Sequence, residues 1–147
     1  MLIYDLNANP LNANEWAFPL TECFHITSFA LSIGMIALVD LRLLGLGMKH
    51  QTPGQIVKDT GIWTFAGLVI VIISGLLIFS SDPLRYWYNS GFQFKMAVLL
   101  LAILFNYTIH RKVALSNASP MMGKLVGAIS LVLWVLVPFG GIWISFV

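Results

Sequence analysis

The chain has 147 residues, of which 59% are hydrophobic and only 10% are charged, and its formal net charge is +2. A soluble domain carries roughly 25% charged residues, so most of this surface must face something other than water. No block of basic residues points to nucleic acid as a partner. One crossing of a bilayer takes roughly 20 apolar residues, so the length suits four crossings with short loops and leaves no room for a soluble domain.

The amino-terminal segment, residues 1–20, is predicted to lie at the membrane surface on the outer side. It is polar and aromatic, with Trp16 and Phe18 near its end and a tandem Leu-Asn-Ala-Asn repeat at residues 6–9 and 11–14. An ordered terminal segment is usually held by contacts with the rest of the protein or with a partner. We therefore expect a protein partner or a homo-oligomer, in addition to membrane lipid.

Four apolar runs follow, at about residues 21–48, 61–81, 91–114 and 121–147. The β-branched second run alone would also suit a buried strand. Strands cross lipid only in a closed barrel, however, and four runs of this length favour helices. The predicted fold class is therefore all-α, with residues 1–147 forming a single membrane domain that is a bundle of four transmembrane helices.

The basic residues predict the orientation of this bundle. Six of the eight flank the first and third connections between the runs, namely Arg42, Lys49, Lys58, Arg111, Lys112 and Lys124. Connections rich in Lys and Arg stay in the cytoplasm. Both termini are then expected outside, which in a bacterium is the periplasm, and the predicted location is the bacterial inner membrane.

Small residues predict where the helices approach one another. Lipid supplies no hydrophobic drive for helices to associate, so close packing depends on small side chains and on interhelical hydrogen bonds. Gly123, Gly127 and Ser130 fall on one stripe of the fourth run, and Gly67 and Ser74 fall on one side of the second. These stripes are expected to form the helix interfaces.

Three titratable residues, Glu22, His25 and Lys95, are predicted to meet near the outer end of the bundle. His25 and Lys95 each lie about one turn into the first and third runs, which cross in the same direction, so their depths should match. Glu22 precedes His25 by three residues and shares its helix face. A histidine facing a space between helices is a natural axial ligand for haem iron. The simpler alternative is that His25 and Lys95 reach out to the headgroups, with Glu22 pairing Lys95.

A second cluster is predicted toward the basic end, with Asp40 at about the depth of His110 and Arg111; its other members are Arg42 and Asn106. Charged groups within the membrane nearly always pair, so the simplest interpretation is a clamp between the first and third helices. A proton path through Asp40 and His110 stays open as an alternative. His50 and His110 both lie on this side and cannot reach the depth of His25.

Hydrolytic chemistry has no basis in the sequence. There is no Gly-rich phosphate loop, no zinc-type cysteine pair, and no Ser-His-Asp set in a plausible register. Cys23 and His25 are two residues apart, so on a helix they face different sides and disfavour a shared copper ion.

Three short segments resemble a loose group of small bacterial four-helix membrane proteins, which includes copper-resistance protein D-like domains and HemJ-type protoporphyrinogen oxidases. They are Phe24-His25, Asp40-Leu41-Arg42 and residues 91–96. In the HemJ type, a helix-one histidine and a helix-three lysine are associated with b-type haem or porphyrin, and His25 and Lys95 match these positions. The chain has Asn106-Tyr107 where that type tends to carry a further histidine, and it also differs in the fourth helix.

Two functions are therefore expected. The first is a small membrane protein that binds a haem b or porphyrin near the periplasmic face and acts in electron transfer or porphyrin handling. His25 would be the iron ligand, Lys95 a second ligand or propionate partner, and Glu22 an orienting group; any enzymatic activity would be that of a haem- or porphyrin-linked oxidoreductase. The second is an accessory subunit of a larger membrane complex, without a cofactor.

Overall fold

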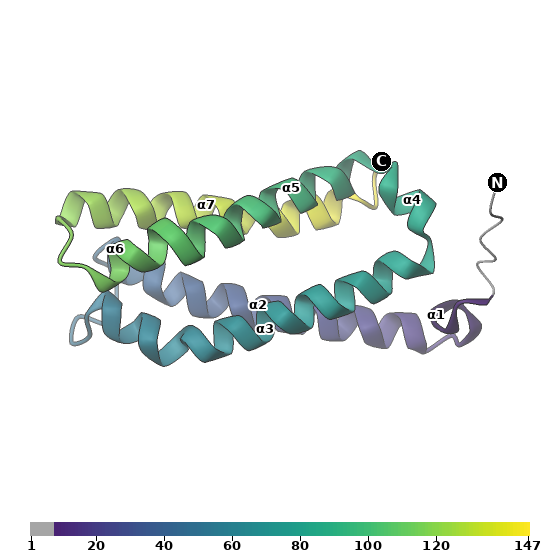
Figure 1. Ribbon diagram of the computed structural model, residues 1–147, viewed down its shortest axis with the longest axis horizontal. Coiled ribbons are helices and arrows are strands. Elements are labelled where there is room, and N and C mark those ends of the chain that lie inside the picture. The colour runs from purple at the N-terminus through teal and green to yellow at the C-terminus, as the bar shows by residue number, and fades with distance from the viewer. Residues whose placement is uncertain (1–7) are drawn as a thin grey trace.

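The structure, a computed structural model, describes residues 8–147, and its long helices run side by side as a bundle (Figure 1). Four spans are long and apolar enough to cross a membrane. The predicted all-α fold class with four transmembrane helices is therefore confirmed. In chain order the elements are α1 (Pro10–Ala13), α2 (Ala17–Leu43), α3 (Pro53–Ser81), α4 (Pro83–Trp87), α5 (Ser90–Phe105), a π-helical turn η2 (Asn106–His110), α6 (Arg111–Leu115) and α7 (Pro120–Trp143).

The first long helix starts and ends earlier than predicted. It begins at Ala17 instead of residue 21, which places Pro19 in the first turn, where the missing N–H has no partner to lose. It ends at Leu43 instead of residue 48, because Gly45 and Gly47 adopt left-handed backbone conformations with φ of 84° and 64°. Such glycines terminate helices.

The second long helix begins at Pro53, well before the predicted residue 61. The Thr52 hydroxyl accepts a hydrogen bond from the Gln55 backbone N–H, and the Gln55 side chain accepts one from the Thr52 N–H. This capping box satisfies two of the free amides at a helix start. The helix therefore extends through Lys58 and Asp59, which the apolar pattern had assigned to the connection.

The third and fourth spans correspond to the predictions more closely. The third runs from Ser90 to Leu115 through α5, η2 and α6, and contains a π-helical turn that the sequence did not predict. The fourth ends at Trp143 instead of residue 147. The carbonyls of Ile144 and Val147 accept hydrogen bonds from Asn89 instead, which fastens the chain end to the start of α5.

The described part of the amino-terminal segment is held by the chain itself. The side-chain amides of Asn9 and Asn12 donate to the carbonyls of Ser80 and Ser81 at the end of α3, at 2.7 Å and 2.9 Å. These two Asn residues of the repeat thus satisfy carbonyls at a helix end. Residues 1–7, with the first part of the repeat, lie outside the described residues, and a protein partner or homo-oligomer stays a prediction.

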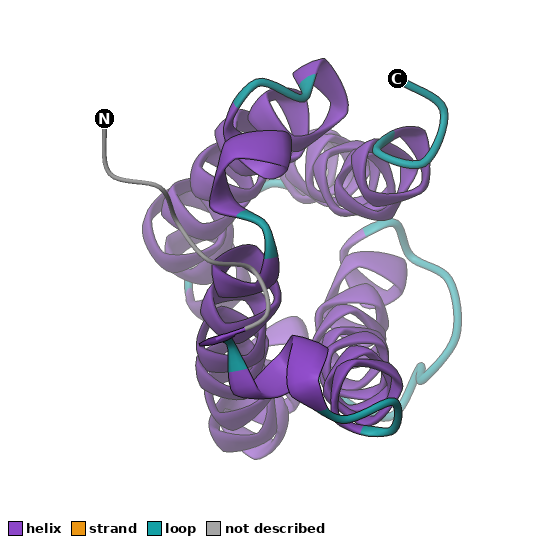
Figure 2. Ribbon diagram, turned by 90° about the vertical axis from the view of Figure 1, so that its right-hand side faces the viewer, coloured by secondary structure: helices purple, strands orange, loops and turns teal. Residues whose placement is uncertain are grey.

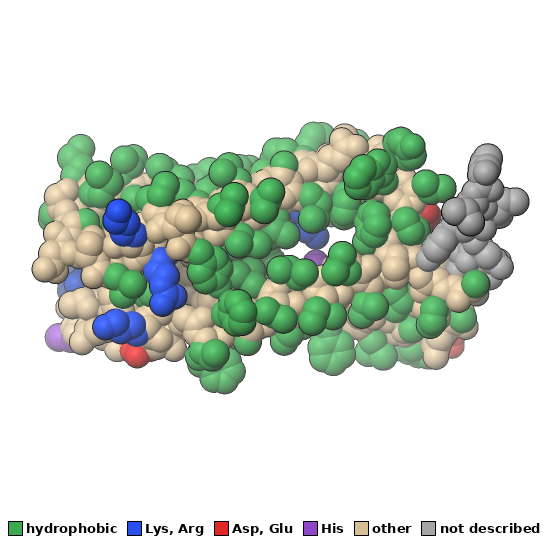
Figure 3. Space-filling view, viewed as in Figure 1, with side chains coloured by type: hydrophobic (Ala, Val, Ile, Leu, Met, Phe, Trp, Pro, Cys, Tyr) green, Lys and Arg blue, Asp and Glu red, His purple; other side chains and the backbone are tan. Residues whose placement is uncertain are grey.

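The surface of the bundle is apolar and its interior is partly polar. Large hydrophobic side chains cover the long sides, whereas most of the basic side chains visible on the same face gather at one end (Figure 3). Ser32, Asp40 and Ser130 are each 0% exposed. This reverses the usual distribution of a soluble protein and is what a lipid environment demands. The molecule is a multi-pass membrane protein.

The helices pack as two pairs joined along one side. α2 packs on α3, α5 packs on α7, and α2 contacts α7, as the view onto the end with α1 and α4 shows (Figure 2). Gly123 and Gly127 of α7 face the backbone and side chain of Leu43 and the carbonyl of Asp40 in α2. The stripe of small residues predicted for the fourth run therefore forms a helix interface.

Replacing Gly67 with alanine should destabilise the α2–α3 pair. A Cβ at this position would overlap the Ser32 hydroxyl and lie 3.0 Å from the Ser28 carbonyl, so the two helices would have to move apart. Overpacking of this kind costs about 1–3 kcal/mol. Gly34→Ala is the matched control, because a Cβ at Gly34 meets nothing within 4 Å. Unfolding of both variants in detergent measures the difference, and equal stabilities would contradict the packing argument.

Candidate functional site

His25 points from α2 toward α3, where its ring is anchored at one nitrogen. Its Nδ1 lies 2.9 Å from the Ser74 hydroxyl oxygen. Ser74 in turn donates its single proton to the carbonyl of Ile70 at 2.6 Å. With its proton donated to Ile70, the Ser74 hydroxyl can only accept from His25, and this favours the tautomer that carries hydrogen on Nδ1.

In this tautomer the other ring nitrogen, Nε2, carries a lone pair. Besides Ser74, the ring has a second hydrogen-bond partner on α3 in the backbone of Val71. The flank of α3 is flat beside the ring, since a Cβ at Gly75 would lie only 3.1 Å from His25 Cε1. Ser74 and Gly75 are adjacent in the sequence, so one forms the hydrogen bond and the other leaves space for the ring. An oriented imidazole with a lone pair on one nitrogen is suited to bind a metal.

Lys95 of α5 lies across the bundle from the α2–α3 pair. It is half-buried, and its side chain runs along α7, where a Cβ at Gly140 would lie 3.0 Å from Lys95 Cβ and one at Gly141 3.6 Å from its Nζ. The two glycines therefore leave the space that the lysine occupies. Its ammonium is close enough to His25 and to Glu22 to interact with both electrostatically. The structure thus brings His25 and Lys95 to one level of the bundle.

Glu22, the predicted orienting group, interacts with Lys95 at a distance and not by direct contact. Its side chain is exposed. The one ion pair within 4.0 Å among residues 8–147 joins Asp40 and His110, so Glu22 does not close an ion pair with Lys95. Ser74, which the sequence assigned only to helix packing, is the residue that holds the His25 ring. No periodicity in one sequence reports which residue of another helix lies opposite.

A hollow opens on the face between α3 and α5, and a histidine and a basic side chain are visible inside it (Figure 3). It follows from the pairing of the helices, because α3 packs on α2 and α5 packs on α7, with no comparable packing between α3 and α5 over the described residues. The apolar core adjoins this region, with Phe29 one turn along α2 from His25 and its ring 6.3 Å from that of Trp134.

Trp134 carries an unused hydrogen-bond donor in this core. The side chain is 1% exposed, and within residues 8–147 its Nε1 is the one buried side-chain nitrogen or oxygen without a hydrogen-bond partner. An unsatisfied buried donor costs about 1–3 kcal/mol. Such a cost is relieved when a ligand or a bound water supplies an acceptor.

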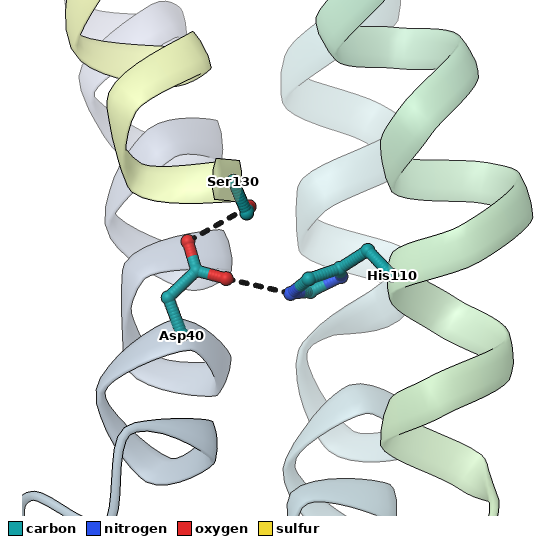
Figure 4. A network of polar contacts seen from close by, with 3 residues as sticks. All are labelled: Asp40, His110 and Ser130. Atoms are coloured by element: carbon teal, nitrogen blue, oxygen red, sulfur yellow. Dashed lines mark hydrogen bonds and ion pairs between the residues drawn. The ribbon is translucent and has the colours of Figure 1, made fainter. Parts of the chain in front are cut away.

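The second cluster, at the depth of Asp40, joins three of the four spans (Figure 4). His110 Nε2 lies 2.6 Å from one carboxylate oxygen of Asp40, and the Ser130 hydroxyl donates to the other at 2.9 Å. The predicted clamp between the first and third helices is confirmed. Ser130 of α7 extends it to the fourth helix, and this residue had been assigned only to packing. Arg42 faces away and donates to the carbonyl of Gln51.

The described residues offer little to a bare metal ion. No group of three or more His, Cys, Asp or Glu side chains in residues 8–147 is placed to hold one, and Cys23 is exposed. A single histidine could serve a metal that brings its own ring of ligands. Haem iron is such a metal, since the macrocycle supplies four nitrogens and the protein one or two.

Comparison with known proteins gives a family without a function. Residues 17–147 match the family described as "Family of unknown function (DUF6644)", and this region includes the four long helices and both polar clusters. No curated protein and no solved structure matches the chain. Because the match extends over most of its length, the chain belongs to the DUF6644 family.

Proposed function

We propose that this protein binds one haem b or a related porphyrin in the hollow between α3 and α5, with His25 as the iron ligand. The observation that carries the proposal is the hydrogen bond between His25 Nδ1 and Ser74, because the tautomer with hydrogen on Nδ1 leaves the lone pair of Nε2 for iron. Histidines that ligate metals almost always donate their other N–H to a neighbouring group, because this bond fixes the tautomer and the ring orientation.

Lys95 is the residue we assign to a porphyrin propionate. An ammonium within the membrane needs a negative partner. Among residues 8–147 no carboxylate lies within 4.0 Å of Lys95. A propionate would provide the missing charge without requiring the lysine to lose its proton, as direct ligation of iron would.

The proposed function is electron transfer or porphyrin handling in a bacterial inner membrane. A bound haem would supply one-electron chemistry, while His25 and Ser74 fix its position and the apolar helices keep out water. The basic end would face the cytoplasm, which puts His25 near the periplasmic side. The resemblance of His25 and Lys95 to the histidine and lysine of HemJ-type proteins supports the same assignment.

The direct test is the visible spectrum of the full-length protein purified in detergent. A Soret band, with haem b identified by the pyridine hemochrome assay, is the expected result. If the preparation is colourless, it is titrated with haemin, and the protein should take up one equivalent. A protein that neither carries haem nor binds added haemin would overturn the proposal in favour of a subunit without a cofactor.

Replacing Ser74 with alanine should weaken haem binding by about 10–100-fold, which is the usual effect of removing a group that orients a ligating histidine. Ser74→Thr should retain binding, because the hydroxyl stays. Ser116→Ala, at an exposed serine near the basic end, is the control. Haemin titration followed by absorbance gives the affinities, and an unchanged affinity for Ser74→Ala would mean that this hydrogen bond has no part in binding.

A further inference from the structure

The cluster of Asp40, His110 and Ser130 has no part in the proposed haem site, and it is built differently from a simple clamp. Ser130 donates its hydroxyl proton to one oxygen of the Asp40 carboxylate, and Nε2 of His110 lies at hydrogen-bond distance from the other. With Nε2–H as the second donor, both oxygens of the carboxylate are satisfied. The remaining ring nitrogen, His110 Nδ1, makes no hydrogen bond to any residue in 8–147.

His110 borders a cavity of about 30 Å³ between the first half of α3 and the π-helical turn. A water molecule needs roughly 10–15 Å³ of such space, and it stays there only if polar groups surround it. Both conditions are met, because the lining has polar side chains as well as apolar ones. The polar and charged members are Thr60, Thr64, Asn106, Tyr107, His110 and Arg111.

The π-helical turn accounts for the concentration of these groups. It spans Asn106–His110 within an otherwise α-helical span. A π-turn has more residues per turn than an α-helix, and such turns are rare and frequently lie at functional sites. Here three of its five residues line the cavity. The irregular turn therefore presents His110 to Asp40 on one side and to the cavity on the other.

We propose that Asp40 and His110 form a proton-binding site that exchanges its proton with water in this cavity. A hydronium ion in the cavity gives a proton to His110 Nδ1 and becomes water. The resulting imidazolium is stabilised by the Asp40 carboxylate through Nε2–H, and release is the reverse transfer. The pair changes from a net charge of −1 to zero when it takes up the proton.

Arg111 is an exposed basic side chain at the rim of the cavity. Its guanidinium lies over Gly61, where a Cβ would be 3.9 Å from Nη1, and it borders the same cavity. The elements around His110 contribute further polar groups. They include Asp40 from α2, Tyr107 from η2 and the Ser130 hydroxyl from α7. The lining residues of α3 carry no charge, because Lys58 and Asp59 are exposed.

A purely structural Asp40–His110 pair would keep one protonation state, whereas an exchanging pair takes up and releases a proton as the pH changes. Ring-nitrogen NMR of ¹⁵N-histidine-labelled protein in lipid nanodiscs distinguishes them. His25→Gln, His50→Gln and His110→Gln assign the three histidines. The His110 signals should move with pH in one reversible step. In Asp40→Asn, where the negative partner is gone, proton binding at His110 should be at least tenfold weaker.

A second variant tests the route through the cavity without touching the pair. Gly61→Ala adds a methyl group to the lining at an ordinary contact distance from Arg111, and should slow proton exchange at His110 several-fold. Gly34→Ala is its control and should leave the rate unchanged. His110 signals that stay fixed at every pH where circular dichroism shows intact helices would overturn the proposal, as would a step that Asp40→Asn does not shift. Repeating the titration in His25→Ala keeps this result independent of haem.

Discussion

Replacing His25 with alanine should remove haem from the purified protein and abolish the Soret band. Nε2 of His25 is the nitrogen that we assign to iron, and alanine leaves no donor atom at this level of the bundle. His50 and His110 cannot substitute, because both lie toward the basic end, and His110 is already bonded to Asp40. We expect the haem-to-protein ratio, measured by the pyridine hemochrome assay, to fall at least tenfold.

His50→Ala is the matched control for this experiment. His50 is exposed in the connection between α2 and α3, so its replacement should leave both haem content and stability unchanged. Size-exclusion chromatography of each variant in detergent shows whether the protein is folded and monodisperse. Full haem content in a well-folded His25→Ala protein would exclude His25 as the ligand.

Replacing Asp40 with alanine should produce the largest loss of stability among single polar substitutions in the bundle. The change leaves His110 and Ser130 without their shared acceptor. A buried polar group without a partner costs about 1–3 kcal/mol in soluble proteins. Interhelical hydrogen bonds in membrane proteins average about 0.6 kcal/mol, because alternative partners exist in the membrane.

The lower value suits Ser130, since a helical serine can return its proton to a carbonyl of its own helix. The higher value suits His110, whose ring has no such local partner. Together these contributions give an expected loss of about 2 kcal/mol for Asp40→Ala. Asp40→Asn should lose less, because its amide oxygen can still accept one of the two hydrogen bonds.

Unfolding by denaturant in mixed micelles measures these differences. Asp59→Ala is the control, because Asp59 is an exposed carboxylate on α3 and surface changes usually stay within about 0.5 kcal/mol. An Asp40→Ala protein as stable as Asp59→Ala would show that the cluster does not hold the helices together. The haem content of Asp40→Ala should be unchanged, which separates the role of this cluster from that of His25.

The sequence by itself determined the membrane assignment and the number of spans. With 59% hydrophobic and 10% charged residues, the chain cannot cover itself with a soluble surface, and lipid allows only helices or a closed barrel. It also determined which titratable residues lie at similar depths. Depth follows from counting residues along a helix that rises 1.5 Å per residue. For this reason Asp40 was placed at the depth of His110 and Arg111, of which His110 is its partner, and His25 and Lys95 lie at one level.

Only the tertiary structure decided which groups on other helices complete each cluster. The spans are apolar on nearly all sides, so no amphipathic period marks the buried face, and Ser74 and Ser130 read simply as small packing residues. Their roles depend on the rotation of α3 and α7 about their own axes, which the contacts at Gly67, Gly123 and Gly127 set. The π-helical turn at Asn106–His110 is likewise a product of packing. It directs His110 at Asp40, and nothing in its sequence requires the wider turn.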